Sequence, residues 1–286
     1  MKITEYLIII CAGAICAFLF ANCTTNPVGE GNISEQKLQV KGQVTLSGDA
    51  DPEGVFVWLN GIGISVRTDE NGNFNLTLPP PASQSASGGL EGIFNLYYYV
   101  ANYGLETSEV LIQKGEFVYS KGDLNKDGEL ITPKSLTQFL EIKTDVAPVS
   151  VPVNFGERIG VTVTVTALGQ DSVSVDFPNS IGGFLGAIFL RNIDTGEVHI
   201  FSGPPTELKD KVLVIREGHF RQLLFTISNN PLPIGKYEVI PYLLVAHENI
   251  PVELLSSLGN NIESLSPNYL AIPFRRDVAI FEVSNE

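Results

Sequence analysis

The sequence predicts an all-β protein of two tandem β-sandwich domains, which follow an N-terminal signal helix and a flexible tether. Three observations predict this fold class. β-Branched and aromatic residues dominate the apolar positions, many segments alternate apolar and polar residues, and 27 glycines and 17 prolines are spread through the chain. This composition is typical of short strands joined by tight turns, and a length of 286 residues accommodates two ordinary domains.

Residues 1–22 form the predicted signal peptide. Residues 7–21 carry no charge, and this run is shorter than the about 20 residues that a membrane-spanning helix needs. A short charged start before such a run is typical of a secretory signal. The next residues, Leu19-Phe-Ala-Asn-Cys23-Thr-Thr25, resemble the end of a bacterial lipoprotein signal, which implies cleavage before Cys23 and lipid attachment to it. Ordinary cleavage near Ala21 and an uncleaved anchor are the alternatives.

A polar tether is expected at residues 23–37, where small and polar side chains leave little to pack. No cysteine follows Cys23, so exported domains would have to be stabilised by packing without disulfide bonds. More than one acyl chain on Cys23 would anchor the protein stably in the bacterial cell envelope, facing the periplasm or the exterior. The net charge of −14 repels phosphate backbones, which argues against a nucleic-acid partner.

The first domain is predicted at residues 38–144 and contains short alternating strands. Trp58, the only tryptophan, lies in a dense apolar segment that we expect to be buried. Asn71 and Gly72 tolerate positive φ angles and are expected to turn a hairpin between the strands on either side. The strands are predicted at 38–47, 54–59, 62–67, 74–78, 93–101 and 109–112, with a Ser/Gly-rich loop at 82–89.

Three segments of this domain carry a family resemblance: Val40-Lys-Gly-Gln-Val44, Gly54-Val-Phe-Val-Trp-Leu59 and Thr68-Asp-Glu-Asn-Gly-Asn-Phe74. They resemble the carboxypeptidase regulatory-like domain, a small transthyretin-like β-sandwich of exported bacterial proteins, over residues 38–115. We expect Gly42 to let a neighbouring backbone approach and Phe74 to close the core over Val57. The family serves as a spacer or binding module without chemistry of its own, so the resemblance implies a fold and no catalytic function.

The sharpest chemical motif is Gly-Asp-Leu-Asn-Lys-Asp-Gly-Glu-Leu-Ile at residues 122–131. Asp123, Asn125 and Asp127, with Glu129 contributing its backbone carbonyl, resemble the first half of a calcium loop of the EF-hand or dockerin type. Lys134 occupies the twelfth position, where such loops carry a carboxylate. The alternative is an Asx-rich turn that joins two strands. Apart from this calcium, no cofactor is expected.

The second domain is predicted at residues 145–286 as an immunoglobulin-like sandwich of seven or eight strands. Its clearest strand is 159–166, in which alternate valines share one face. Its middle loosely resembles bacterial intracellular proteinase-inhibitor domains, through a hairpin around Asp194-Thr-Gly196 and the corner Pro233-Ile-Gly-Lys-Tyr237. We expect Tyr237 to pin a loop.

Residues 246–266 form an insertion in which Val252, Leu255 and Leu258 follow helical spacing. This apolar stripe is expected either to pack on the sandwich as a lid or to face a partner. Packing is the favoured interpretation.

A search for catalytic residues finds little. His199, His219 and His247 lack short metal-ligand spacing, and the sequence holds neither a Gly-x-Ser-x-Gly turn nor a glycine loop that opens a helix. The alternative class is an enzyme or protease inhibitor that uses loops 178–186 and 246–268.

The sequence therefore predicts a non-enzymatic exported lipoprotein that acts as a binding or scaffold module. The expected partners are carbohydrate or another envelope protein, and the membrane through the lipid anchor at Cys23. Tyr97, Tyr98 and Tyr99 are candidate contacts, with Tyr98 on the opposite face of its strand from the other two.

Overall fold

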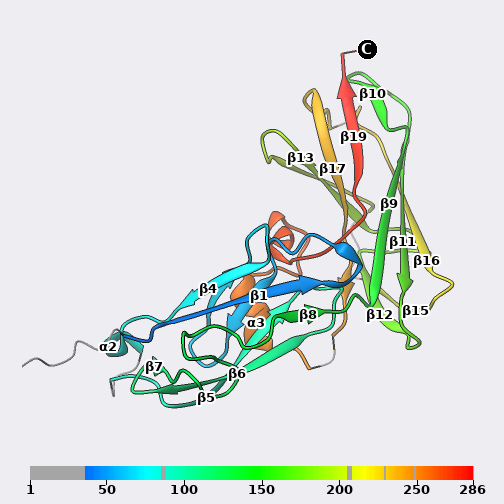
Figure 1. Ribbon diagram of the computed structural model, residues 1–286. Helices are drawn as coiled ribbons and strands as arrows, with labels where there is room; N and C mark the ends of the chain where they lie inside the picture. Colours follow the sequence, from blue (N-terminus) through cyan, green and yellow to red (C-terminus); the bar gives the residue numbers. More distant parts are fainter. Residues whose placement is uncertain (1–35, 85–87, 205–207, 229, 248, 286) are drawn as a thin grey trace, which may run out of the picture. The chain divides into compact units, whose positions relative to one another are not determined.

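The computed structural model describes residues 36–84, 88–204, 208–228, 230–247 and 249–285 (Figure 1). Lys37–Glu286 form one compact unit. The predicted signal peptide, the lipid site at Cys23 and the tether up to residue 35 lie outside the described residues. The described chain is all-β, which confirms the predicted fold class.

The first half of this unit contains two sheets whose strands come from residues 39–136. The smaller sheet has the order β4-β1-β8 and the larger the order β3-β2-β5-β6-β7. Strand β1 pairs antiparallel with β4 and parallel with β8. The strands are β1 (Gln39–Leu46), β2 (Phe56–Leu59), β3 (Ile64–Arg67), β4 (Asn73–Thr77), β5 (Gly92–Tyr99), β6 (Glu106–Gln113), β7 (Glu116–Phe117) and β8 (Lys134–Leu136).

The core of the first half lies between these two sheets. Val40 and Val44 of β1 and Phe74 of β4 are buried against Val57 of β2 and Tyr98 of β5. The alternation of the sequence explains this arrangement, because every second side chain of a strand points to the same face. The expectation that Phe74 and Val57 share a core is confirmed.

The predicted hairpin across Asn71 and Gly72 is wrong, although the turn itself forms. Strand β3 pairs with β2, whereas β4 pairs with β1, so the turn carries the chain from one sheet to the other. Gly72 has a φ of 76°, and an added Cβ would lie 2.1 Å from the carbonyl oxygen of Val44. Its own carbonyl accepts a hydrogen bond from the amide of Val44 at 2.8 Å. The close contact and the hydrogen bond between Gly72 and Val44 therefore hold this turn against β1.

The second half contains three sheets. A five-stranded sheet has the order β10-β19-β17-β13-β14, and two three-stranded sheets have the orders β16-β11-β9 and β15-β12-β18. The strands are β9 (Leu140–Ala147), β10 (Ser150–Pro152), β11 (Ile159–Ala167), β12 (Val173–Pro178), β13 (Ala187–Asn192), β14 (Val198–Ser202), β15 (Lys209–Val214), β16 (His219–Phe225), β17 (Gly235–Pro241), β18 (Leu244–Val245) and β19 (Ala279–Ser284).

Several local predictions for this half are confirmed. Strand β11 alternates as expected, with Val161, Val163 and Val165 fully buried in the core. Strands β13 and β14 form the predicted hairpin. The Tyr237 hydroxyl donates to the carbonyl oxygen of Pro233 at 2.6 Å, so it pins the preceding loop. Strand β9 begins at Leu140, ahead of the junction expected at residues 144 and 145, and pairs with β11 along its whole length.

Both halves contribute to a third apolar cluster. Trp58 and Tyr99, from β2 and β5, pack in the same cluster as Phe189 of β13, Tyr242 and Tyr269. Tyr269 lies in the short 3-10 helix η2 (Pro267–Ala271), with its ring stacked on Phe189 at a centroid distance of 5.2 Å. The two halves are therefore joined by a buried aromatic layer.

The insertion contributes to this aromatic layer. Helix α3 (Val252–Leu258) buries Leu254 fully and packs Leu255 and Leu258 partly against it. The packing interpretation of the insertion is confirmed, except that Val252 is exposed and the buried position is Leu254. The further short elements are η1 (Ser47–Asp49) and α2 (Pro81–Gln84).

Candidate functional site: a polar groove on the first sandwich

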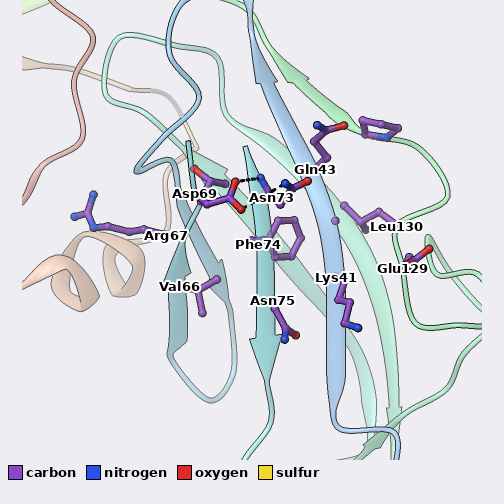
Figure 2. A pocket seen from close by; sticks show the side chains of 13 residues that line it. Lys41, Gln43, Val66, Arg67, Asp69, Asn73, Phe74, Asn75, Glu129 and Leu130 are labelled. Atoms are coloured by element: carbon purple, nitrogen blue, oxygen red, sulfur yellow. Dashed lines mark hydrogen bonds between the residues drawn. The ribbon is translucent and has the colours of Figure 1, made fainter. Parts of the chain in front are cut away.

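The candidate site is a groove of about 780 Å³ beside strands β1 and β4 (Figure 2). In the antiparallel register Lys41 lies opposite Asn75, and Gln43 lies opposite Asn73. These four side chains occupy the exposed face because their neighbours along each strand point into the core. The two strands thus present a row of amide groups and one ammonium group to solvent.

Two apolar side chains of the core border the groove between its polar residues. Phe74 lies between β4 and β1 in Figure 2, with Leu130 on the far side of β1. An added Cβ on Gly42 would lie 2.6 Å from Leu130 Cδ1 and 2.7 Å from Phe74 Cε1. Gly42 therefore makes room for two side chains, which corrects the expectation that it admits a neighbouring backbone.

One wall of the groove is the end of the Asp-rich loop. The amide of Lys41 donates to the Gly128 carbonyl at 3.0 Å, and the amide of Leu130 donates to the Lys41 carbonyl at 2.9 Å. These two bonds fix the loop against β1 and place Glu129 beside the exposed amides. The sequence motif is therefore part of the site through its backbone.

The groove carries few charges. Lys41 contributes one positive charge and Asp69 and Glu129 two negative charges, whereas the Arg67 guanidinium points away from the groove (Figure 2) and donates to the Gly54 and Ala271 carbonyls. The Asp69 carboxylate accepts hydrogen bonds from the backbone amides of Asn73 at 2.8 Å and Asn71 at 2.9 Å. The bond from Asn73 is the main reason that the pKa of Asp69 lies below its usual range, so Asp69 is ionised at neutral pH.

Two of the groove side chains are free to bind. Within the part of the chain that the structure describes, Lys41 Nζ and the Asn75 amide make no hydrogen bond, whereas Gln43 donates to the Asn71 carbonyl at 3.1 Å. Amide groups donate and accept at the same time, so the row suits a ligand that does both. Hydroxyl groups of a neutral ligand meet this requirement.

The structure places the Asp-rich motif as a tight turn. The Asn125 side-chain oxygen accepts from the amides of Asp127 at 2.8 Å and Glu129 at 2.9 Å. An Asp123 oxygen accepts from the Glu109 amide at 3.0 Å and lies 3.6 Å from Lys134 Nζ. The Asx-turn interpretation thus accounts for Asp123 and Asn125, and calcium binding stays a prediction. In the described ranges, no three His, Cys, Asp or Glu side chains lie close enough to hold a metal ion.

The three tyrosines proposed as contacts are largely unavailable. Tyr98 is buried in the core of the first half, where its hydroxyl donates to Ser108 at 3.1 Å. Tyr99 is buried in the aromatic layer between the halves, and Tyr97 packs on Trp58 at a centroid distance of 5.6 Å. Burial raises the pKa of Tyr98 and of Tyr99 well above the usual range. Both hydroxyls are therefore neutral packing groups.

Of the two loops named for the alternative function, 246–268 lines a smaller hollow of about 290 Å³, to which the described residues of 178–186 do not contribute. It brings together His247, Asp176 and Glu263. His247 Nε2 is hydrogen-bonded to the Ala101 carbonyl, and its ring packs edge-on against Tyr99 and Phe139. Burial lowers the pKa of His247, so it is a neutral packing group at pH 7. The histidine in this hollow is thus already hydrogen-bonded and packed.

Sequence reasoning missed the groove because its residues look ordinary one by one. Lys41, Gln43, Asn73 and Asn75 are the polar positions of two alternating strands, which a sequence assigns to solvent. Only the pairing of β1 with β4 shows that they form one row. A usable signal was present, since the exposed positions of both strands are rich in amides, with Gln39 and Gln43 in β1 and Asn73 and Asn75 in β4.

No family model matches the chain, and no curated protein matches it. Among solved structures, a DUF3823 family protein from Bacteroides ovatus ATCC 8483 shares 12% identity over 74% of this chain and 96% of its own, with a TM-score of 0.28. The Bacillus anthracis TIE protein shares 12% identity over 87% of this chain and 32% of its own, with a TM-score of 0.24.

A third similar structure is BcpA, the major pilin subunit of Bacillus cereus, with 14% identity over 70% of this chain and 63% of its own, and a TM-score of 0.24. TM-scores of this size carry no argument about function. Within the described part of the chain, none of the helices combines the length and apolar character that crossing a bilayer requires.

Proposed function

We propose that the chain is a non-enzymatic exported lipoprotein that acts as a binding or scaffold module of the bacterial cell envelope. Cys23 is its lipid-attachment residue and the carboxypeptidase regulatory-like first half is its ligand-binding part. The site residues need no cofactor for this role. The predicted signal peptide at residues 1–22 supports export, and the polar groove supports ligand binding.

The ligand class that fits the groove is a neutral carbohydrate. The observation that carries this assignment is the row of Lys41, Gln43, Asn73 and Asn75 on the exposed face of β1 and β4, in which three of the four side chains are neutral amides. These amides can both donate to and accept from sugar hydroxyls without requiring a charged ligand.

Binding is tested with an array of neutral and acidic oligosaccharides. We expect the full chain to retain a neutral oligosaccharide, and Asn75→Ala or Lys41→Ala to weaken that binding about tenfold, since each removes a free hydrogen-bonding group. Asn260→Ala is the matched control, because Asn260 is exposed and lies outside the groove. A blank array, or equal binding by Asn75→Ala, contradicts a carbohydrate site in the groove.

Anchoring is tested by the intact mass of the membrane-extracted protein. The expected mass is that of residues 23–286 plus the acyl groups on Cys23. Cys23→Ala should lose the acyl mass and leave the membrane fraction. An unmodified mass that begins before Cys23 contradicts the lipoprotein assignment and leaves the groove prediction standing.

The rival function is an enzyme or a protease inhibitor that uses the loops of the second half. It would need a catalytic group free to react, and the His247 ring in the hollow is packed and hydrogen-bonded. This observation supports the binding module.

A further inference from the structure

Four of the seven arginines of this acidic chain line one small pocket. The pocket has a volume of about 190 Å³ and lies between the end of β3, strands β13 and β17, and the segment that precedes β19. Glu238 is the one carboxylate in its lining. The four guanidinium groups are those of Arg67, Arg191, Arg275 and Arg276.

Three of these arginines have partners that hold them in place. Arg67 donates to the carbonyls of Gly54 at 3.0 Å and Ala271 at 2.6 Å, and Arg275 donates to the Asp51 carbonyl at 2.8 Å. Carbonyl groups are neutral, so these bonds fix the side chains without compensating their charge. Only Arg191 is paired with a carboxylate of the pocket, through its ion pair with Glu238.

Arg276 is the fourth arginine, and it has no such partner. Its guanidinium lies over the ring of Phe274, with Cζ 4.6 Å from the ring centroid. Its Nε is buried without a hydrogen-bond partner, and no hydrogen bond or ion pair joins it to any other described residue. Burial lowers the pKa of Arg276, and Arg191 acts in the same direction while Glu238 opposes it. An arginine nevertheless stays charged at neutral pH.

The lining thus carries four positive charges against one negative charge, an excess of three. The carboxylates of Asp51 and Glu53 act on Arg275 from outside the lining and offset part of this excess. Burial is the main cause that lowers the pKa of Arg275, and the like charge of Arg67 acts in the same direction.

We propose that this pocket binds a small oxyanion, a phosphate or a carboxylate group, with Arg276 as its central ligand. The planar fork of a guanidinium matches the paired oxygens of either group. A volume of about 190 Å³ admits one such group or the anionic end of a longer ligand. Arg67 is the one residue that this pocket shares with the lining of the groove of the first sandwich, and the anion site does not depend on the function proposed for that groove.

The test is thermal unfolding of the full chain at pH 7 in sodium phosphate, sodium malonate or sodium chloride of equal ionic strength. Phosphate or malonate at about 50 mM should raise Tm by roughly 5 °C over chloride if the dissociation constant is on the order of 1 mM. The salt that produces the larger shift identifies the group that the pocket prefers. Equal Tm in all three salts overturns the proposal.

Variants separate this pocket from general salt effects. Arg276→Met should lose the anion-dependent shift and keep or raise Tm in chloride, because it replaces a partly buried cation that lacks a carboxylate partner with an apolar side chain. Arg216→Met is the matched control, since Arg216 donates to the Gly169 carbonyl and lies outside the pocket. It should keep the full shift. An undiminished shift in Arg276→Met overturns the proposal.

A second variant tests anion binding in the pocket if the Arg276→Met protein does not fold. Arg191 is about half exposed, and Arg191→Gln changes the pocket charge with little loss of packing. It should weaken phosphate or malonate binding about tenfold by isothermal titration, because it removes one guanidinium and leaves Glu238 unpaired. Unchanged affinity in Arg191→Gln also contradicts an anion site in this pocket.

Discussion

Asn102 shows how a single buried polar side chain joins distant segments. Its amide nitrogen donates to the carbonyls of Leu140 at 2.9 Å and Arg275 at 2.7 Å, and its oxygen accepts from the Arg275 amide at 3.0 Å. The residue is fully buried. These bonds tie the segment after β5 to the start of β9 and to the segment before β19, so one side chain of the first half is bonded to two segments of the second half.

Asn102→Ala should lower the free energy of unfolding by roughly 3 kcal/mol, because it leaves buried backbone groups without partners. Urea unfolding measures the change. The exposed Asn75→Ala provides the comparison and should change the free energy by less than about 0.5 kcal/mol. A similar small effect at Asn102 would contradict the role given to its hydrogen bonds.

Asn125 tests the interpretation of the Asp-rich loop. Asn125→Ala should lower the free energy of unfolding by about 1 kcal/mol, since two backbone amides lose their acceptor. The loss should be the same in calcium and in a chelator, and Asp127→Ala should have little effect in either. A rise of Tm with millimolar calcium that disappears in Asp127→Ala would establish the alternative, a metal site.

His247 makes stability depend on pH. Its pKa is lowered in the folded state by burial, so the unfolded chain binds the proton more readily. The resulting stabilisation is complete above the unfolded pKa of about 6.5 and is lost as the pH falls toward the folded value, by up to about 1.4 kcal/mol per pH unit. His247→Leu should therefore lose less stability between pH 7 and 5 than the unchanged chain. An identical pH dependence in both proteins would contradict this assignment.

The sequence predicts the role of a single side chain correctly where its partner is a near neighbour in the chain. Tyr237 was expected to pin a loop, and its partner Pro233 lies four residues away. Tyr99 was proposed as a ligand contact, but it is buried by residues from β13 and the insertion. No residue near Tyr99 in the sequence indicates that these distant segments bury it.

Strand β11 and the turn at Asn71 and Gly72 show what alternation can and cannot predict for an element. The valines of β11 share one face because period two is a local property of a strand. The partner of a strand is not local. The Asn71 and Gly72 turn has hairpin residues, yet the strands on either side pair with β1 and β2 in different sheets. The polar groove could not be predicted for the same reason, since it requires the pairing of β1 with β4.

Helix α3 tests how the insertion is held. Leu254 is fully buried in the aromatic layer, whereas Val252 of the same helix is 74% exposed. Leu254→Ala should lower the free energy of unfolding by about 2 to 5 kcal/mol, because it leaves a cavity. Val252→Ala, the control, should change it by less than about 0.5 kcal/mol. Chemical denaturation of both variants measures the difference, and equal values would show that the helix does not pack as described.

The buried aromatic layer makes the two halves one cooperative unit. Trp58, the only tryptophan, lies in that layer and therefore reports on its integrity. Its fluorescence and the far-ultraviolet circular dichroism should follow a single, coincident unfolding transition. Two separate transitions would show that the halves unfold independently. The sequence predicted two successive domains, and no local pattern in it indicates the shared cluster, which is built from residues far apart in the chain.

The pairing of β1 with β8 sets the order in which the chain can fold as it emerges. Strand β1 is the middle strand of its sheet, and its parallel partner lies about ninety residues later, where Val44 meets Lys134. Strand β17 likewise has the final strand β19 as a neighbour. Neither sandwich can be completed until its last strand is available for pairing. Pairing between strands so far apart in the sequence is also slow to form. A chain that leaves a ribosome or crosses a membrane N-terminus first would thus stay open long enough to be threaded through a narrow channel.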